Sequence, residues 1–140
     1  MRMDFRAVWR DAWNMKTLNH SAVYVETTRA NIHDIVRTLI DAVGAETVGH
    51  IAGSTDATAP HRWAHPQGTE LDILTKERLR LGYRVWLTLQ SLEDPQAAVD
   101  WLMAPNRALD EERPMDFIAR LHAQQVVSTA ETLVTGDETR

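Results

Sequence analysis

Cysteine is absent from the 140-residue sequence, and this absence excludes several classes of site at once. Without cysteine the chain has no disulfide, no thiolate nucleophile and no cysteine-ligated zinc or iron–sulfur site. Long apolar runs are also missing, and the N-terminus carries Asp4 and Asp11 where an export signal needs a continuous apolar core. We therefore expect a cytoplasmic protein with no membrane segment and no cofactor.

Acidic side chains outnumber basic ones by 20 to 15, and the excess is unevenly distributed. Residues 1–90 hold eleven basic and ten acidic groups, whereas residues 91–140 hold four basic and ten acidic groups. Because phosphate binding requires local positive charge, any contact with nucleic acid belongs to the first part. The acidic part is expected to bind a protein partner or to stay solvated.

Apolar residues recur at helical spacing through most of the chain, and no strand alternation is found after residue 30. Helices are predicted over 31–44, 45–52, a short segment through 61–63, 70–92, 94–104, 113–121 and 124–136, with Asn31, Asp94 and the glycines at 44, 53 and 136 marking ends. The class is therefore all-α. The helix over 70–92 is predicted to bury Leu71, Leu74, Leu81, Val85, Leu89 and Leu92, with Arg78, Arg80 and Arg84 outside this stripe.

The first thirty residues fit two different local structures. One helical face is formed by Phe5, Val8, Trp9, Ala12 and Trp13, and a short extended piece fits Tyr24 between Val23 and Val25. We interpret residues 1–30 as an N-terminal arm or extension, 31–92 as a helix-turn-helix-like domain with a long connecting helix, and 93–140 as a second, small helical domain.

Residues 32–63 have the layout of a helix-turn-helix, with a supporting helix, a short helix ending at Gly53 and a third helix bearing polar side chains. The side chains able to face a major groove are Thr58, His61, Arg62 and His65. Arginine can bind a guanine edge through two hydrogen bonds, and threonine and histidine suit bases and phosphates equally. A plain helical hairpin with Arg62 at its surface explains the same spacing, so operator DNA is one possible partner.

The sequence gives little support for a catalytic site or a metal site. The serines lack the surroundings of a nucleophile elbow, no glycine-rich loop is present, and the acidic run 110–112 is best explained as a solvated turn. His61 and His65 stand four apart with His50 as a conceivable third ligand, but no HExxH motif accompanies them. We therefore predict no catalytic residue and no metal site, and a small enzyme is the least supported class.

The most specific motif is AVDWLMAPNRALDEERPMD at residues 98–116, which contains Trp101, Pro105, Asn106, Leu109 and Pro114. Together with Ile51-Ala52-Gly53, Arg62-Trp63 and Arg78-Leu79-Arg80, it resembles the Xre/MbcA/ParS-type antitoxins over about residues 31–136. In that family a helix-turn-helix half precedes a small helical toxin-binding domain. The five motif residues are then chiefly architectural.

The resemblance implies a non-enzymatic bacterial antitoxin that forms a homodimer and a hetero-oligomer with a RES-domain toxin that consumes NAD. The toxin-binding domain is then residues 93–140, and toxin and antitoxin together repress their own operon. The C-terminal helix and tail occlude the toxin's active site through Gln124, Gln125, Ser128, Glu131, Thr132 and the tail from Gly136. A stand-alone helix-turn-helix transcriptional regulator is the alternative.

The sequence also departs from the family pattern before the last helix. Members commonly have a glycine at this junction, whereas here it reads Leu121-His122-Ala123-Gln124. The turn must therefore form without the residue best suited to positive φ.

Overall fold

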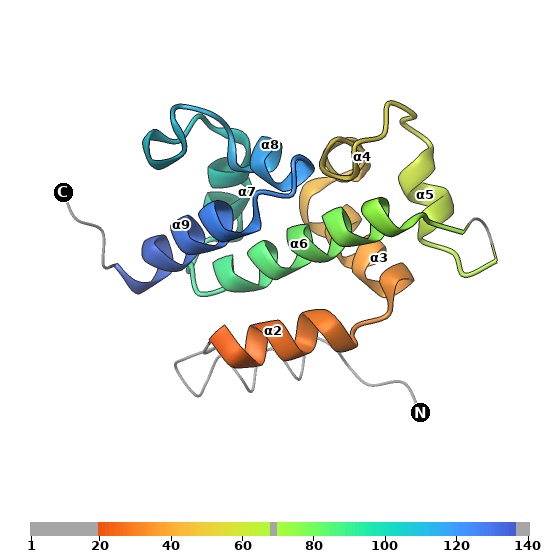
Figure 1. Cartoon of the computed structure of the whole chain (residues 1–140), viewed down its shortest axis with the longest axis horizontal. Helices are drawn as coiled ribbons and strands as arrows, with labels where there is room; N and C mark the ends of the chain where they lie inside the picture. The colour runs from red at the N-terminus through yellow and green to blue at the C-terminus, as the bar shows by residue number, and fades with distance from the viewer. Residues whose placement is uncertain (1–19, 68–69, 137–140) are drawn as a thin grey trace.

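The computed structural model describes residues 20–67 and 70–136, and every named element in this part of the chain is helical. The all-α prediction is confirmed. The predicted helical face from Phe5 to Trp13 lies outside the described residues. In chain order the elements are α2 (His20–Arg29), α3 (Ile32–Val43), α4 (Ala45–Ala52), α5 (Ala59–Trp63), α6 (Ile73–Leu89), α7 (Pro95–Met103), the 3-10 helix η1 (Arg107–Leu109), α8 (Pro114–Ala119) and α9 (Ala123–Thr135) (Figure 1).

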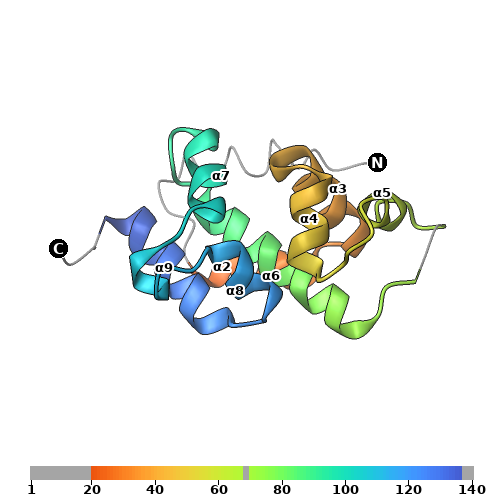
Figure 2. The same cartoon turned by 90° about the horizontal axis from the view of Figure 1, so that it is seen from above.

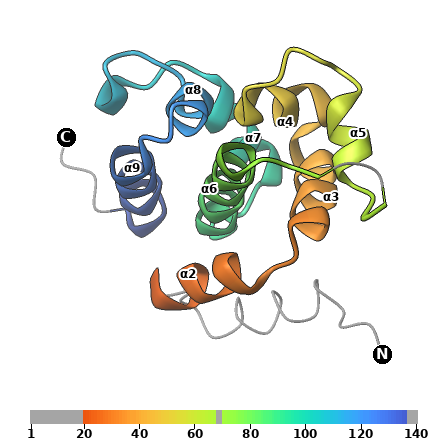
Figure 3. The ribbon, with the colours of Figure 1, turned by 45° about the vertical axis from the view of Figure 1, so that its right-hand side comes forward.

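The long helix α6 is the centre of the fold and contacts α2, α3, α4, α8 and α9 (Figure 3). Gly82 of α6 faces side chains of α3, α4 and α8. A Cβ atom at this position would lie 3.2 Å from Cγ2 of Ile51 in α4 and 3.7 Å from Cγ2 of Ile118 in α8. The absence of a side chain therefore allows α6 to approach both neighbours. Buried side chains from residues 31–92 and from residues 93–140 belong to one core.

The predicted buried stripe of α6 is right except at one position. Leu71, which precedes the helix, and Leu81, Val85 and Leu89 are buried, and Leu92 is partly buried. Leu74, by contrast, is 53% exposed. The helix begins only at Ile73, so Leu74 lies in its first turn, at the end that extends past α4 and α8 (Figure 2).

Residues 20–29 are helical, so the extended alternative around Tyr24 is wrong. Packing against α6 explains the difference, because Val23 and Thr27 of α2 are buried while Tyr24 is 55% exposed. Arg80 of α6 also donates to the backbone oxygens of Thr27 and Ala30, at 3.0 and 2.9 Å. These contacts are long-range and override the local β propensity of the segment.

Arg80 is one of three arginines that bind the C-terminal end of another helix. Arg37 of α3 donates to the oxygen of Ala64 after α5, and Arg78 of α6 donates to the oxygen of Ala119 in α8 at 2.8 Å. The last carbonyls of a helix lack partners within it and carry partial negative charge. The guanidinium groups therefore join neighbouring helices by satisfying their ends.

Most predicted helix ends are also found. The side chain of Asn31 accepts from the amide of His33 at 2.8 Å, and that of Asp94 accepts from the amide of Gln96 at 2.9 Å. Gly44 ends α3, as predicted, with a φ of 89° and a ψ of 152°. This region of backbone space is open to glycine almost alone.

Candidate functional site

The helix α9 carries the described residues that the resemblance assigns to toxin binding. Its inner face is buried against the core and consists of Val126, Val127 and Ala130. On its other faces, the exposed side chains are Gln124, Gln125 and Ser128, and the partly buried ones are Glu131 and Thr132. Gly136 ends the helix with a φ of 68°. The tail residues 137–140 lie outside the described residues.

Helical spacing divides this set into two stripes. Gln124, Ser128 and Glu131 follow at intervals of four and three residues and therefore share one face. With Ala123 and Val127 they line a groove of about 400 Å³ beside α6. Gln125 and Thr132 are seven residues apart and are offset around the helix from this groove.

Arg84 of α6 lies in the same groove. Its guanidinium carbon is 5.4 Å from the centre of the Tyr24 ring in α2, a distance at which an aromatic face attracts a cation. Figure 3 shows α9 beside α6, with α2 below them. The sequence correctly places Arg84 outside the buried stripe, but nothing in it indicates that both α2 and α9 lie near this residue.

The turn between α8 and α9 sets the direction of α9 and has Leu121 where glycine is usual. Leu121 has a φ of 60°. Its amide donates to the oxygen of Ile118 at 3.0 Å, and the amide of His122 donates to the oxygen of Phe117 at 2.9 Å. These are the two hydrogen bonds of a Schellman motif, and the edge-to-face packing of the Phe117 and His122 rings, with centroids 5.3 Å apart, supplies its usual side-chain contact. The chain therefore turns without glycine by placing a leucine in the left-handed region.

The loop between α7 and α8 is organised by Asn106. Its side-chain oxygen accepts from the amide of Ala108 at 2.9 Å, and its backbone oxygen accepts from the amides of Leu109 and Glu111. Its own amide donates to the oxygen of Glu112 at 3.0 Å. Of the other motif residues, those that are buried are Leu109 and Pro114, Trp101 is partly buried, and Pro105 is exposed.

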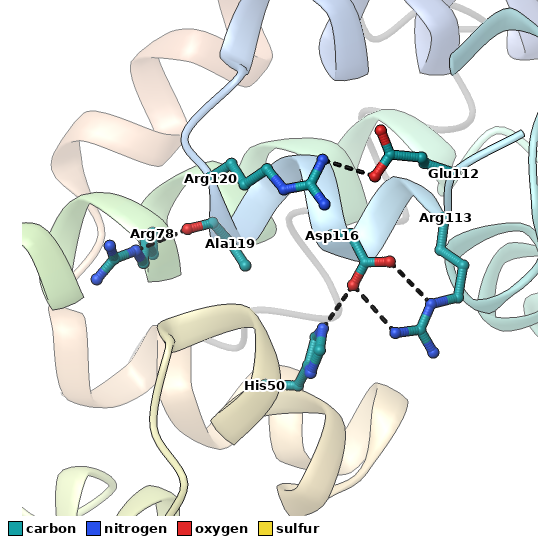
Figure 4. Close-up of polar contacts among 7 residues, drawn as sticks. All are labelled: His50, Arg78, Glu112, Arg113, Asp116, Ala119 and Arg120. Carbon is teal, nitrogen blue, oxygen red and sulfur yellow. Dashed lines mark hydrogen bonds and ion pairs between the residues drawn. The ribbon is translucent and has the colours of Figure 1, made fainter. Parts of the chain in front are cut away.

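Asp116 of α8 joins α8 to α4 (Figure 4). Its carboxylate accepts two hydrogen bonds from Arg113, both at 3.0 Å, and lies 2.7 Å from Nε2 of His50. The bond from Arg113, followed by that from His50, lowers the pKa of Asp116 below its ordinary value. The sequence suggested His50 only as a conceivable metal ligand, and its contact with α8 was missed because the two residues are 66 positions apart.

The short helix α5 and its flanks carry the residues predicted to face DNA. Thr58 precedes the helix, His61 and Arg62 lie in it, His65 follows it, and all four are exposed. Arg62 donates to Thr58 Oγ1 at 2.8 Å and to Asp56 Oδ2 at 3.1 Å. Hydrogen bonds from the amide and hydroxyl of Thr58, and then from Arg62, lower the pKa of Asp56 to about 2. The arginine of this segment is therefore already paired with a carboxylate.

Two further features concern metal and membrane. Within residues 20–67 and 70–136, no three or more histidine, aspartate or glutamate side chains are grouped to hold a metal ion. His50 is hydrogen-bonded to Asp116. Across the same two ranges, no helix combines the length and the apolar character needed to cross a bilayer.

Comparison with known proteins adds two findings. Residues 83–129, from the middle of α6 into α9, match the family model for the antitoxin Xre/MbcA/ParS C-terminal toxin-binding domain. A chain in the crystal structure of the M. tuberculosis MbcT–MbcA toxin–antitoxin complex has a similar fold, with a TM-score of 0.66 and 24% sequence identity, over 79% of this chain and 100% of that one. No curated protein matches the sequence.

The two findings cover different lengths of the chain. The family match includes the Asn106 loop, Asp116 and most of the groove-lining part of α9. The structural match extends the shared fold over most of the chain. Residues 83–129 therefore match the C-terminal toxin-binding domain of the Xre/MbcA/ParS antitoxins, and most of the chain shares the fold of a chain of the MbcT–MbcA complex.

Proposed function

We propose that this antitoxin neutralises a RES-domain toxin that consumes NAD, by placing α9 and the residues after it in the toxin's active-site cleft. The observation that carries the proposal is the amphipathic character of α9, which exposes Gln124, Gln125 and Ser128 while its inner face is part of the core. A helix that is already ordered loses little conformational entropy on binding, so ordering of the chain does not weaken its association. Steric occlusion requires no chemistry from the antitoxin, and we propose a non-enzymatic protein acting in the cytoplasm.

The test is co-expression with the toxin encoded by the adjacent reading frame, with growth and cellular NAD as readouts. Deleting residues from Gln124 onward would also remove core side chains, so a single exposed substitution is sharper. We expect Ser128→Arg to abolish protection because the long charged side chain prevents close approach. Ser91→Arg, an exposed serine beyond the end of α6, is the matched control and should protect fully. Full protection by Ser128→Arg would contradict occlusion by α9.

We propose a second role for α5, in repression of the operon by the toxin–antitoxin complex. Exposed His61 and His65 beside Arg62 support contact with operator DNA, whereas the pairing of Arg62 with Asp56 supports weak binding by the free antitoxin. A mobility-shift titration at low salt tests this role. The complex should shift the operator at lower protein concentration than the free antitoxin, and Arg62→Ala should weaken the shift. Strong binding by the free antitoxin would favour the stand-alone regulator instead.

Repression and neutralisation both fit an antitoxin that is a homodimer and forms a hetero-oligomer with its toxin. A dimer presents two α5 segments to two operator half-sites, which raises the effective concentration of the second contact. Sedimentation velocity of the free antitoxin and of the purified complex tests this assembly. A monomeric antitoxin at micromolar concentration would contradict the homodimer.

A further inference from the structure

The groove beside α9 contains a cation although it lies in the acidic part of the molecule. Residues 91–140 carry four basic and ten acidic groups, yet the side chain that α6 contributes to the groove is Arg84. On the α9 side, the groove offers hydrogen-bonding groups from Gln124 and Ser128 and apolar contact from Val127. The groove therefore combines a positive charge from Arg84, a negative charge from Glu131, polar groups and an apolar surface, which is the composition of a site for a side chain of a protein partner.

Arg84 lies close to α2 as well as to α9. The ring of Tyr24 lies against its guanidinium, and Tyr24 and its neighbour Val25 are large apolar side chains that α2 leaves exposed. A guanidinium held over an aromatic face by cation–π attraction can still donate hydrogen bonds from the N–H groups at its edge. This edge matches the two oxygens of a carboxylate.

We propose that the groove receives a segment of the toxin whose Asp or Glu carboxylate pairs with Arg84, while Tyr24 acts as a positioning residue for the guanidinium. This inference rests on the proposed function, because Gln124 and Ser128 belong to both surfaces. A partner that covers the polar side of α9 also covers the mouth of the groove.

The binding experiment titrates the toxin encoded by the adjacent gene with full-length antitoxin variants, followed by calorimetry. Arg84→Gln should bind at least about tenfold more weakly, since truncating one member of a desolvated charge pair leaves the other unpaired. Arg84→Lys keeps the positive charge but lacks the planar edge that can form two hydrogen bonds with a carboxylate. Its affinity should lie between that of the wild type and that of Arg84→Gln. Arg107→Gln, at an exposed arginine on η1, is the matched control and should bind normally.

Two readouts separate recognition from a structural role. The affinity of the wild-type antitoxin should fall more steeply with salt than that of Arg84→Gln, because one ion pair is lost in the variant. Tyr24→Phe should keep normal affinity, whereas Tyr24→Ala should bind more weakly. Arg84→Gln could also have a lowered melting temperature. In that case the affinity of Arg84→Lys distinguishes recognition from a structural role, because lysine keeps most of the aliphatic stem.

Wild-type affinity and salt dependence in Arg84→Gln, with binding lost in Ser128→Arg, would overturn this inference and leave the α9 proposal standing. Normal affinity in Ser128→Arg would overturn both, since the groove shares that residue with the occluding surface.

Discussion

Replacing Leu121 tests how the backbone at the α8–α9 turn holds α9. Leu121 is partly buried and has a φ of 60°, so its replacement changes both packing and backbone strain. Comparing Leu121→Gly with Leu121→Ala separates the two effects. Both variants lose the leucine side chain, but only alanine keeps a Cβ atom in the left-handed conformation.

The expected difference follows from two opposing effects. A left-handed residue with a Cβ atom is strained by about 1–2 kcal/mol, which glycine avoids. The greater freedom of glycine in the unfolded chain offsets about 0.4–1 kcal/mol of this gain. Leu121→Gly should therefore be more stable than Leu121→Ala by about 0.5–1 kcal/mol. Loss of the partly buried side chain lowers the stability of both variants by about 1 kcal/mol.

Urea unfolding followed by circular dichroism measures both variants under the same conditions. The predicted difference corresponds to about 2–4 °C in melting temperature for a chain of this size. Equal or greater stability of Leu121→Ala would refute the assignment of left-handed strain at this turn. The amide proton of His122, which forms the longer-range bond of the turn, should exchange equally slowly in the wild type and in Leu121→Gly.

Other substitutions test contacts elsewhere in the chain. Asp116→Asn should lower the free energy of unfolding at pH 7 by about 1–2 kcal/mol, as measured by urea titration. Because folding lowers the pKa of Asp116, the wild-type advantage is present above its ordinary value of 3.8 and is lost as the pH falls below it; an advantage that is unchanged at pH 2 would contradict the contact. Asn31→Ala removes the N-cap of α3 and should cost about 1 kcal/mol, while Asn31→Ser should restore most of it. Gly82→Val should destabilise the fold by about 2 kcal/mol or more in thermal unfolding, because its Cβ would meet Ile51; a neutral effect would show that α4 and α6 can separate freely. Asp56→Asn should strengthen retention of the purified protein on heparin at low salt by releasing Arg62, and unchanged retention would show that Arg62 contributes no accessible charge.

Local sequence patterns correctly predicted helices whose ends are determined by residues close to them in the sequence. The side chains of Asn31 and Asp94 mark the starts of α3 and α7 because each bonds an amide two residues away. The burial of Leu81, Val85 and Leu89 follows from a spacing that the sequence displays directly. These features depend on short-range geometry and are therefore readable without the fold.

Features that depend on distant residues were not predicted. The helical state of α2 depends on packing against α6 and on Arg80, which lies about fifty positions later. The contact between His50 and Asp116 and the position of Arg84 beside Tyr24 arise in the same way. Each involves a charged or polar side chain whose partner is chosen by the arrangement of helices rather than by spacing along the chain.

The central position of α6 has a thermodynamic consequence for the whole protein. One side of α6 packs against α9, and other sides pack against α3 and α4. Because these helices share one core, opening α9 removes contacts that also stabilise the segment leading to α5. A toxin bound to α9 would therefore raise the unfolding free energy of the α3–α5 region by mass action, and hydrogen exchange there would slow without any contact between that region and the toxin.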